Sequence, residues 1–531
     1  MSGAIEQARL VRALARSIGS RSPTAPAAIL ETHISYVLLT GEYAYKIKKA
    51  VAFGFLDFTT LAARRHFCEQ ELRLNRRLAP ALYLDVVPVT GSTDAPQFGG
   101  GGAALEYAVK MREFPQNALA SVLLAHGELG ADDIDALATE VAAFHAAIAV
   151  ADASGPYGSA DGILRIARRN TEEIAPLIAT DSERAQVDDL RDWTEREHAR
   201  RLATFQRRRE QGFVRECHGD LHLGNIARID GKLVIFDCIE FNDEMRWIDV
   251  MSEVAFTVMD LEDRSRPDLA HRFLNGYLER TGDYAGLAVL PFYLAYRALV
   301  RAKVALLRSA QAGDGASRAL ADARGYLRLA SRYAEAPRPA LIVTTGLSGS
   351  GKTTLTEALL ERISAVRVRS DVERKRMHGL APLARVGARV EQGLYSPAAT
   401  DSAYDRLRAV ARDIVGAGRI AIVDAAFPRR SQRESFRALA AELGIPFVIL
   451  AFEATEPTLR RRVAARHARG SDASDADVAV LEHQIATREA LTAPERAHAV
   501  IYDAEAPVEA ARAPGAWSAV VARLGGSPGK R

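Results

Sequence analysis

Cysteine is scarce in this chain, which has only three, Cys68, Cys217 and Cys238, among its 531 residues. So few cysteines exclude a disulfide framework at this length, and we therefore expect a protein of the reducing cytoplasm. Long apolar runs are also missing, since no stretch approaches the roughly 18 consecutive apolar residues that suggest a membrane span. The first twenty residues lack the continuous apolar core of a signal peptide. We expect no membrane partner.

A strong excess of charge of one sign is absent as well. The formal net charge is +3, and 26% of the residues are charged, whereas nucleic-acid-binding domains have denser basic patches. The most basic segment, residues 195–210, interleaves glutamates with its arginines, a pattern that favours a solvated helix over a nucleic-acid interface. Nucleic acid is therefore not an expected partner. The same segment could equally attract an anionic substrate, and the sequence leaves the oligomeric state open.

The length of the chain predicts more than one domain. Pro337 and Pro339 mark the clearest boundary, because each disfavours helix at the residue before it. We predict a first domain over residues 1–333, a linker over 334–339, a second domain over 340–524 and a disordered tail over 525–531.

The two predicted domains differ in their order of elements. The first begins with a hairpin around Gly41, a helix within residues 61–80 and strands within 84–91 and 103–114, and is mostly helical from residue 132. That order predicts an α+β domain. The second alternates helical patterns with apolar strands, the clearest of which lie at residues 341–346, 419–427 and 446–454. That alternation predicts an α/β domain with a parallel sheet.

The segment Gly346–Thr354, "GLSGSGKTT", matches the phosphate-binding loop G-x-x-x-x-G-K-[ST] between an apolar strand and a helical pattern. Its glycines let backbone N–H groups surround a phosphate chain, Lys352 would contact the β and γ phosphates, and Thr353 would bind Mg²⁺. The sequence therefore predicts a nucleoside triphosphate site. Its predicted loop residues are Gly346, Ser348, Gly349, Ser350, Gly351, Lys352, Thr353 and Thr354.

Polar residues beyond this loop indicate what happens to the triphosphate. Asp424 ends an apolar strand, which suits a magnesium site. Asp371 lies where a second strand should end, and there it could accept a proton from a substrate hydroxyl or merely cap the strand. Arg462 and Arg466 are one helical turn apart and could close over the phosphates, or could lie on a solvated helix face.

Residues 340–531 resemble the small-molecule and polynucleotide kinase branch of P-loop proteins, on the motifs "GLSGSGKT", "SDVERKR" and "VDAAF". The resemblance implies that Asp371 is the catalytic base and that Arg374 holds the acceptor substrate.

A second cluster of polar residues lies in "RECHGDLHLGN" and the strand after it. Cys217, His218, His222 and Cys238 could form a zinc cage, but structural zinc sites usually use paired C-x₂₋₄-C units. A cysteine–histidine nucleophile has no further support. The frame H-x-D-x₄-N, followed by Asp237 after an apolar strand, instead matches the acid, amide and metal-binding acid that phosphoryl transfer needs.

This stretch resembles the aminoglycoside phosphotransferase family over about residues 30–330, which implies a protein-kinase-like fold. The resemblance implies Asp220 as catalytic base and Asn225 and Asp237 as magnesium ligands. It also implies that His218 and His222 shape the loop and that Asp249 anchors a helix. The family needs a strand lysine on the phosphates, paired with a helix carboxylate. Lys46 and Glu71 fit best, with Lys48 and Glu69 as alternatives, while residues 107–114 should contact adenine.

Together these patterns predict a cytoplasmic phosphotransferase with two modules, each using ATP and Mg²⁺, that acts on hydroxyl groups of small molecules. The full length resembles a bacterial fusion of the two domain types. Two alternatives stay open: an ATP-sensing regulatory protein with one active kinase module, or a P-loop module that phosphorylates polynucleotide 5′-hydroxyls. The acceptor pockets decide the substrate, and the sequence does not identify it.

Overall fold

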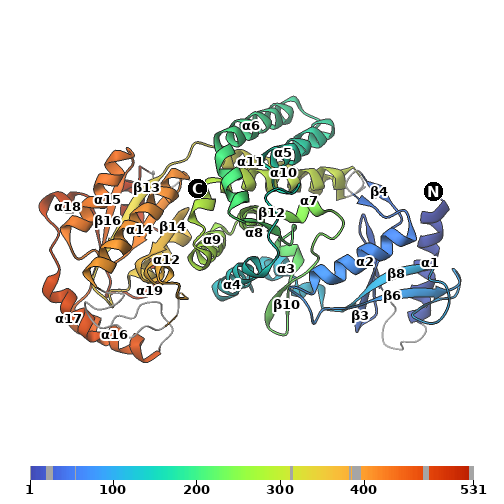
Figure 1. Ribbon diagram of the computed structural model, residues 1–531, viewed down its shortest axis with the longest axis horizontal. Helices are drawn as coiled ribbons and strands as arrows, with labels where there is room; N and C mark the ends of the chain where they lie inside the picture. The colour runs from blue at the N-terminus through green and yellow to red at the C-terminus, as the bar shows by residue number, and fades with distance from the viewer. Residues whose placement is uncertain are drawn as a thin grey trace. The chain divides into compact units, whose positions relative to one another are not determined.

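The computed structural model of the chain describes residues 2–19, 28–53, 56–310, 315–381, 384, 396–469 and 477–525 (Figure 1). The chain forms two compact units, one of residues 1–165 with 205–260, the other of residues 166–204 with 261–531. The predicted linker at 334–339 falls within the second unit. The predicted tail lies outside the described residues, apart from Gly525.

The first unit is built on an antiparallel sheet of order β1-β2-β3-β8-β6-β7. Its strands are β1 (Ala28–Glu31), β2 (Ser35–Leu39), β3 (Tyr43–Lys48), β6 (Tyr83–Gly91), β7 (Pro96–Phe98) and β8 (Glu106–Arg112). The predicted hairpin is present, since β2 and β3 pair around Gly41 with its positive φ of 90°. Leu10 and Leu14 of α1 (Ser2–Gly19) pack on this sheet with Leu38 and Ile47.

Helix α2 (Leu61–Asn75) lies in the predicted segment and packs against Tyr83 and Val109 of the sheet through Cys68. Thr60 caps its first turn by accepting from Ala63 N. The other helices of this part of the chain are η1 (Gln116–Ala118), α3 (Ala120–Ala125), α4 (Ala131–Ala147), α5 (Ala160–Ile174), η2 (Ala175–Leu177), α6 (Asp181–Glu210), η3 (Leu223–Asn225), α7 (Asp243–Arg246) and α8 (Val250–Asp263). The short strands are β4 (Ala52–Phe53), β5 (Leu56–Asp57), β9 (Val214–Glu216), β10 (Ile226–Ile229), β11 (Lys232–Ile235) and β12 (Trp247–Asp249).

The basic segment 195–210 is helical, as predicted, and lies at the end of α6. Arg200 and Arg201 pair with Glu197 within the helix. Arg208 differs from the expectation of a solvated face: it is only 2% exposed and pairs with buried Asp249. That contact fixes Asp249 immediately before α8.

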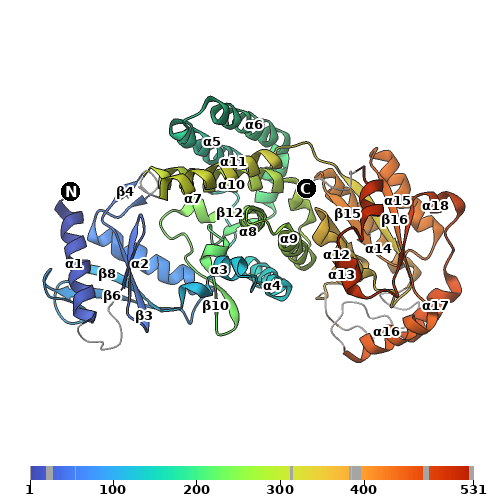
Figure 2. The ribbon, with the colours of Figure 1, turned by 180° about the vertical axis from the view of Figure 1, so that it is seen from behind.

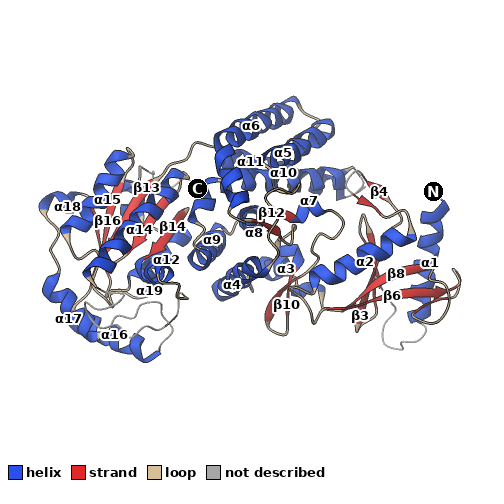
Figure 3. Cartoon of the chain, viewed as in Figure 1, coloured by secondary structure: helices blue, strands red, loops and turns tan. Residues whose placement is uncertain are grey.

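The second unit contains a parallel sheet of order β14-β15-β13-β16-β17 with helices on either side, as Figure 3 shows. Its strands are β13 (Ala340–Thr345), β14 (Ala365–Arg369), β15 (Ile420–Asp424), β16 (Phe447–Glu453) and β17 (Ala499–Asp503). Continuous apolar strands such as "ALIVTT" are expected in a parallel sheet buried on both faces. The predicted α/β domain is therefore present.

The helices that follow the first strand of this sheet, β13, along the chain are α12 (Lys352–Arg362), α13 (Ser370–Met377), α14 (Pro397–Gly416), α15 (Arg430–Glu442), α16 (Glu456–Arg469), α17 (Val478–Thr487), α18 (Ala493–Ala497), α19 (Val508–Arg512) and α20 (Ser518–Arg523). Those before it are α9 (Pro267–Thr281), η4 (Tyr284–Ala288), α10 (Leu290–Ser309) and α11 (Ala316–Tyr333). Helix α9 lies beside α12 and β14 in both views (Figures 1 and 2). Within the described part of the chain, no helix is both long and apolar enough to cross a membrane.

Candidate active sites

Strand β3 points two lysines to one face of the first sheet, because alternate residues of a strand share a side. Lys46 Nζ lies 2.9 Å from Glu71 Oε1 of α2, the pair that the sequence favours, and 2.5 Å from Asp237 Oδ1. Lys48, the alternative, contacts the other oxygen of Glu71 at 2.7 Å. Glu69 instead pairs with Arg65 on the exposed face of α2. The structure thus brings Lys46, Glu71 and Asp237 together.

A second buried carboxylate, Glu240, completes this lysine cluster. It contacts Lys48 Nζ, and both side chains are almost fully buried. Burial alone raises the pKa of Glu71, but the ammonium groups of Lys46 and Lys48 outweigh it and hold that pKa at about 2. Sequence reasoning missed Glu240, although an acidic residue three positions after Asp237 was a signal. The buried charges are compensated, as low-dielectric surroundings demand.

The loop after β9 holds the predicted acid and amide. Asn225 Nδ2 donates to Asp220 Oδ2 at 2.9 Å and to the Asp220 carbonyl at 3.0 Å. His222 Nε2 lies 3.4 Å from Asp220 Oδ2, and its Nδ1 accepts from Gly224 N. Asp220 keeps about a third of its side chain exposed, at 34%. The carboxylate is therefore oriented by its neighbours yet open to a reactant.

Glu253 of α8 fixes the backbone just before Asp220. Its oxygens accept from His218 N at 3.2 Å and Gly219 N at 2.6 Å, and it lies 2.9 Å from His145 Nε2 of α4. Burial alone raises the pKa of Glu253, but His145 and these hydrogen bonds hold it at about 2. Gly219 adopts φ 88°, and a Cβ there would lie 2.8 Å from the Met245 carbonyl. Sequence reasoning missed Glu253, whose signal was that it is the only charged residue among the first ten of α8.

His218 is a structural member of this loop. Its Nε2 contacts the Phe236 carbonyl at 2.9 Å, and its Nδ1 accepts from Asp220 N at 3.3 Å. Burial lowers the pKa of His218, which favours the neutral ring that these two contacts require. The residue ties the Asp220 loop to the segment that carries Asp237.

Asp237 lies two residues after the end of β11. It adopts a left-handed backbone with φ 65°, which turns the chain sharply beside Lys46. Its N–H donates to Tyr83 Oη at 3.1 Å, and the next N–H, of Cys238, donates to Asn75 Oδ1 at 2.8 Å. Side chains of β6 and α2 therefore support the turn.

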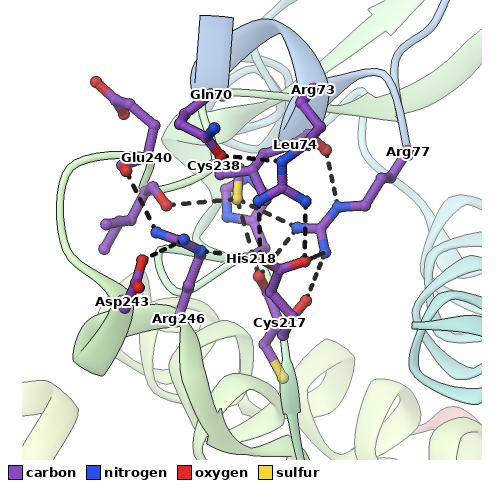
Figure 4. Close-up of polar contacts among 12 residues, drawn as sticks. Gln70, Arg73, Leu74, Arg77, Cys217, His218, Cys238, Glu240, Asp243 and Arg246 are labelled. Carbon is purple, nitrogen blue, oxygen red and sulfur yellow. Dashed lines mark hydrogen bonds and ion pairs between the residues drawn. The ribbon is translucent and has the colours of Figure 1, made fainter. Parts of the chain in front are cut away.

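Three arginines meet at Glu216, beside the same loop (Figure 4). Arg73 in the last turn of α2 and Arg77, two residues after that helix ends, lie 2.9 and 3.2 Å from the Glu216 carboxylate, and Arg246 of α7 lies 3.2 Å from it. Arg77 also donates to the backbone carbonyls of Glu216 and Cys217, at 2.6 and 3.2 Å. The helix that carries Glu71 is thereby fastened to the residues leading to Asp220.

The residues of the alternative zinc cage are engaged elsewhere. Cys217 Sγ lies 3.6 Å from the Ile248 carbonyl, and Cys238 Sγ lies 3.5 Å from Arg77 Nη2. All three cysteines are buried, and none of them forms a disulfide. Burial raises the pKa of both Cys68 and Cys238 to about 12. A thiol with so high a pKa is a poor nucleophile.

The predicted phosphate loop connects β13 to α12 in the second unit. Gly346, Gly349 and Gly351 have φ of 155°, 85° and 78°, and a Cβ on Gly349 would lie 2.8 Å from the Leu459 carbonyl. Lys352 Nζ contacts the carbonyls of Gly346 and Leu347 at 2.8 and 3.1 Å. Burial lowers the pKa of Lys352. The loop wraps around its own lysine, as a phosphate-binding loop does.

The other residues predicted for this site lie in several different elements. Thr353 Oγ1 donates to Asp424 Oδ2 at 2.8 Å, which joins the two predicted magnesium residues. Asp371 lies in the first turn of α13, two residues after β14 ends, and its charge acts on Lys352. Ser348 N donates to Gln484 Oε1 of α17 at 2.8 Å, a contact that sequence reasoning missed. Thr354 is exposed.

The predicted acceptor residue, Arg374, is 7% exposed, and its Nη1 donates to Thr400 Oγ1 at 3.3 Å. Burial raises the pKa of Tyr404 on α14 to about 12. The charge of Arg374 lowers that pKa and the charge of Asp371 raises it. Tyr404 Oη accepts from Phe427 N at 3.0 Å. Tyr404, which sequence reasoning missed, therefore lies with Asp371 and Arg374.

The two arginines of α16 act on different partners. The charge of Arg466 acts on Lys352, whereas that of Arg462, the residue predicted to bind the phosphates, acts on Glu505.

Comparison with known proteins agrees with this division. A family model described as "Phosphotransferase enzyme family" matches residues 57–290, and one described as "AAA domain" matches residues 341–491. The chain is 32% identical to the uncharacterized protein Rv2004c of Mycobacterium tuberculosis over 455 residues, which are 84% of this chain and 87% of that protein. A Mycobacterium bovis protein, Mb2027c, matches with the same identity and coverage. The chain belongs to this family of phosphotransferase–P-loop fusion proteins. Fusion of a protein-kinase-like and a P-loop domain supports a phosphotransferase.

Solved structures resemble the fusion protein one domain at a time. A choline/ethanolamine kinase family protein from Mesorhizobium loti is 11% identical, with a TM-score of 0.36, and the match covers 60% of this chain and 96% of that one. A sugar kinase from Janibacter is 19% identical, with a TM-score of 0.27 over 36% of this chain and 96% of that one. At these scores neither structure says anything about the substrate.

Proposed function

We propose that the fusion protein is an ATP- and Mg²⁺-dependent phosphotransferase with two active modules, each transferring the γ-phosphate to a hydroxyl group of a small molecule. The observation that carries this proposal is that Lys46 contacts both Glu71 and Asp237, that Asn225 orients Asp220, and that Phe236 N, next to Asp237, donates to the Asn225 carbonyl at 2.9 Å. Phosphoryl transfer depends on such positioning and on charge stabilisation more than on covalent chemistry by the protein.

In the first unit, Asn225 and Asp237 would hold Mg²⁺, and Lys46 would hold the phosphates. Amide and carboxylate oxygens are the ligands that Mg²⁺ prefers. Bound Mg·ATP supplies the transferable phosphoryl group. Glu71 keeps Lys46 extended and charged, and Asp220 accepts the proton from the acceptor hydroxyl. Asp220 is partly exposed beside buried neighbours, so an acceptor hydroxyl can reach it, which suits the role of proton acceptor.

In the second unit, the loop from Gly346 to Thr353 would bind the triphosphate, with Thr353 and Asp424 at the magnesium. Ser350 Oγ is buried without a hydrogen-bond partner in the described part of the chain, inside a loop too tight for a Cβ at Gly346. A buried hydroxyl of this kind suits a ligand with hydrogen-bond acceptors. Asp371 would act as base, and Arg374 with Tyr404 would orient the acceptor.

The test measures ATP consumption by wild type and by the single variants Asp220→Ala and Lys352→Ala, against a panel of hydroxylated metabolites. We expect each change to abolish turnover with the acceptors of one module and spare those of the other. If neither change lowers ATP consumption, the two-kinase proposal fails.

The same measurements separate the alternatives. A regulatory protein with one active module would lose all transfer in one variant and none in the other. A polynucleotide kinase would label the 5′ end of an oligonucleotide, and Asp371→Asn would abolish that labelling. We expect no labelling of the oligonucleotide.

A further inference from the structure

Helix α9 lies within the residues that the phosphotransferase family model matches, but it packs against elements of the P-loop half of the chain. Its residues lie within the matched range 57–290, yet they cluster with residues 261–531 in the second unit. The helix packs on α12, which begins at Lys352, and on β14, which leads to Asp371 (Figures 1 and 2). It therefore adjoins both elements that carry the predicted chemistry of the P-loop site.

Asn275 of α9 pairs with the free edge of β14. Its Oδ1 accepts from Arg367 N at 2.7 Å, and its Nδ2 donates to the Ala365 carbonyl at 3.0 Å. β14 is the outermost strand of its sheet, so these backbone groups have no neighbouring strand. Covering an edge in this way is how proteins protect it from unwanted pairing. The side chain also fixes the register of α9 against the strand.

Glu279, one turn further along α9, binds the two arginines of β14. Its Oε1 lies 2.8 Å from Arg369 Nη1, and its Oε2 lies 3.6 Å from Arg367 Nη2. Burial alone raises the pKa of Glu279, but the two guanidinium groups lower it below its ordinary value. The carboxylate is therefore charged at neutral pH.

Arg367 carries this contact to the phosphate loop. It is 6% exposed, and its Nη1 donates to the Thr353 carbonyl at 2.7 Å and to Thr356 Oγ1 at 3.2 Å. Thr353 is thus held at both ends, by Asp424 at its hydroxyl and by Arg367 at its carbonyl. A planar guanidinium is suited to such a link, because its donors point in fixed directions.

Arg272, two turns before Glu279, adds a second attachment. It lies 2.5 Å from Glu357 and 2.8 Å from Glu361, both on α12. Glu357 also lies 3.6 Å from Arg367 Nη2. The helix that starts with the loop lysine is therefore joined to α9 along its length.

We propose that Glu279, supplied by the phosphotransferase half of the chain, is a positioning residue of the P-loop site, acting through Arg367 on Thr353. The proposal rests on the proposed function of that site as a Mg-nucleotide site. Coupling between two sites is reciprocal. If Glu279 on α9 increases the affinity of the P-loop site for Mg-nucleotide, bound nucleotide must stabilise the contacts of α9 by the same free energy.

The first test compares two changes of acid to amide on α9 in the full chain. Both are made in an Asp237→Asn background, which silences nucleotide binding in the first unit, and Mg·ADP affinity is measured by calorimetry. Glu279→Gln is expected to weaken affinity about tenfold. Asp268→Asn is the matched control, because its partner Arg266 lies in the same segment, and it should change affinity less than about twofold. Equal effects of the two changes would overturn the proposal.

A double-variant cycle asks whether Glu279 acts through Arg367. If it does, adding Glu279→Gln to Arg367→Lys weakens Mg·ADP binding no further than Arg367→Lys alone. Additive losses would mean that Glu279 merely stabilises the fold, and the proposal would be wrong.

Hydrogen exchange tests the link without a change at the contact, should Glu279→Gln fail to fold. In the Asp237→Asn background, Mg·ADP should slow exchange in residues 267–281, and Lys352→Ala should remove that effect. Binding that leaves residues 267–281 unaffected would refute the link while the proposed function stands. If Lys352→Ala binds Mg·ADP as well as its parent, the proposed function of this site fails, and the proposal with it.

Discussion

At the scale of single residues, Glu253 shows how one carboxylate organises a loop. Two backbone N–H groups and His145 meet at it, and the residue is fully buried. Removing a buried carboxylate that accepts from several donors leaves those donors unsatisfied, which costs more than each hydrogen bond contributes. No sequence motif contains Glu253, although it holds the backbone just before Asp220.

We predict that Glu253→Gln lowers the free energy of unfolding by about 3 kcal/mol at pH 7 and slows transfer by the first module. Because the pKa of Glu253 is held at about 2, its stabilisation is complete above the ordinary value near 4.5 and is lost as the pH falls toward 2. Wild type should therefore lose stability more steeply than the variant between those values. Denaturant unfolding at a series of pH values measures this.

Glu128→Gln is the control for this prediction. It changes another His–Glu pair, with His126, whose side chains are 57% and 60% exposed. Exposed pairs contribute little, so the stability profile should stay that of wild type. Parallel pH profiles for wild type and Glu253→Gln would contradict the prediction.

At the scale of elements, α2 joins two parts of the first site. Glu71 meets Lys46 and Lys48. Arg73 in the last turn of α2 and Arg77, two residues after the helix ends, meet Glu216 beside the Asp220 loop. A helix is stiff over this distance, so displacement of one end moves the other. The lysine and the base are therefore positioned together.

We predict that Arg77→Met slows transfer by the first module about tenfold and destabilises the fold by about 1–3 kcal/mol, because two backbone carbonyls and part of Glu216 lose their donor. The loss should fall mainly on kcat rather than on KM for ATP. Steady-state kinetics and thermal unfolding measure both effects. The control is Arg65→Met, on the exposed face of α2, which should leave the transfer rate and the stability unchanged. A similar loss in this variant would contradict the interpretation.

The elements and local motifs were largely predictable from sequence, because their signals are local. The hairpin at Gly41, the loop Gly346–Thr354 and the frame of Asp220 and Asn225 each depend on neighbouring residues. Asp371 follows a strand, as the sequence suggested, but lies in the first turn of α13, where an acid is favourable.

Residues that act through tertiary contact were not predictable. Glu240 and Glu253 left only weak signals in the sequence, and the packing of β3 and α8 is what reveals their partners. Asn275 and Glu279 lie about ninety residues from the backbone and arginines that they bind. A pattern of local periodicity holds no information about such pairs.

At the scale of the whole molecule, the P-loop half depends on a helix that precedes it. We predict that a fragment of residues 334–525 unfolds at a lower temperature than the same residues in the full chain, because β14 loses Asn275, and Arg367 and Arg369 lose Glu279. Calorimetry of the fragment and the full chain measures the difference. A fragment as stable as its counterpart in the full chain would show that α9 contributes no stability.

The three buried cysteines have a practical consequence for spectroscopy. Thiol reagents react with the thiolate, and burial holds Cys68 and Cys238 in the protonated form. A cysteine introduced on an exposed helix face would therefore react far faster than any native one. Fluorophore or spin-label pairs can be attached for distance measurements across the chain without removing a single native thiol.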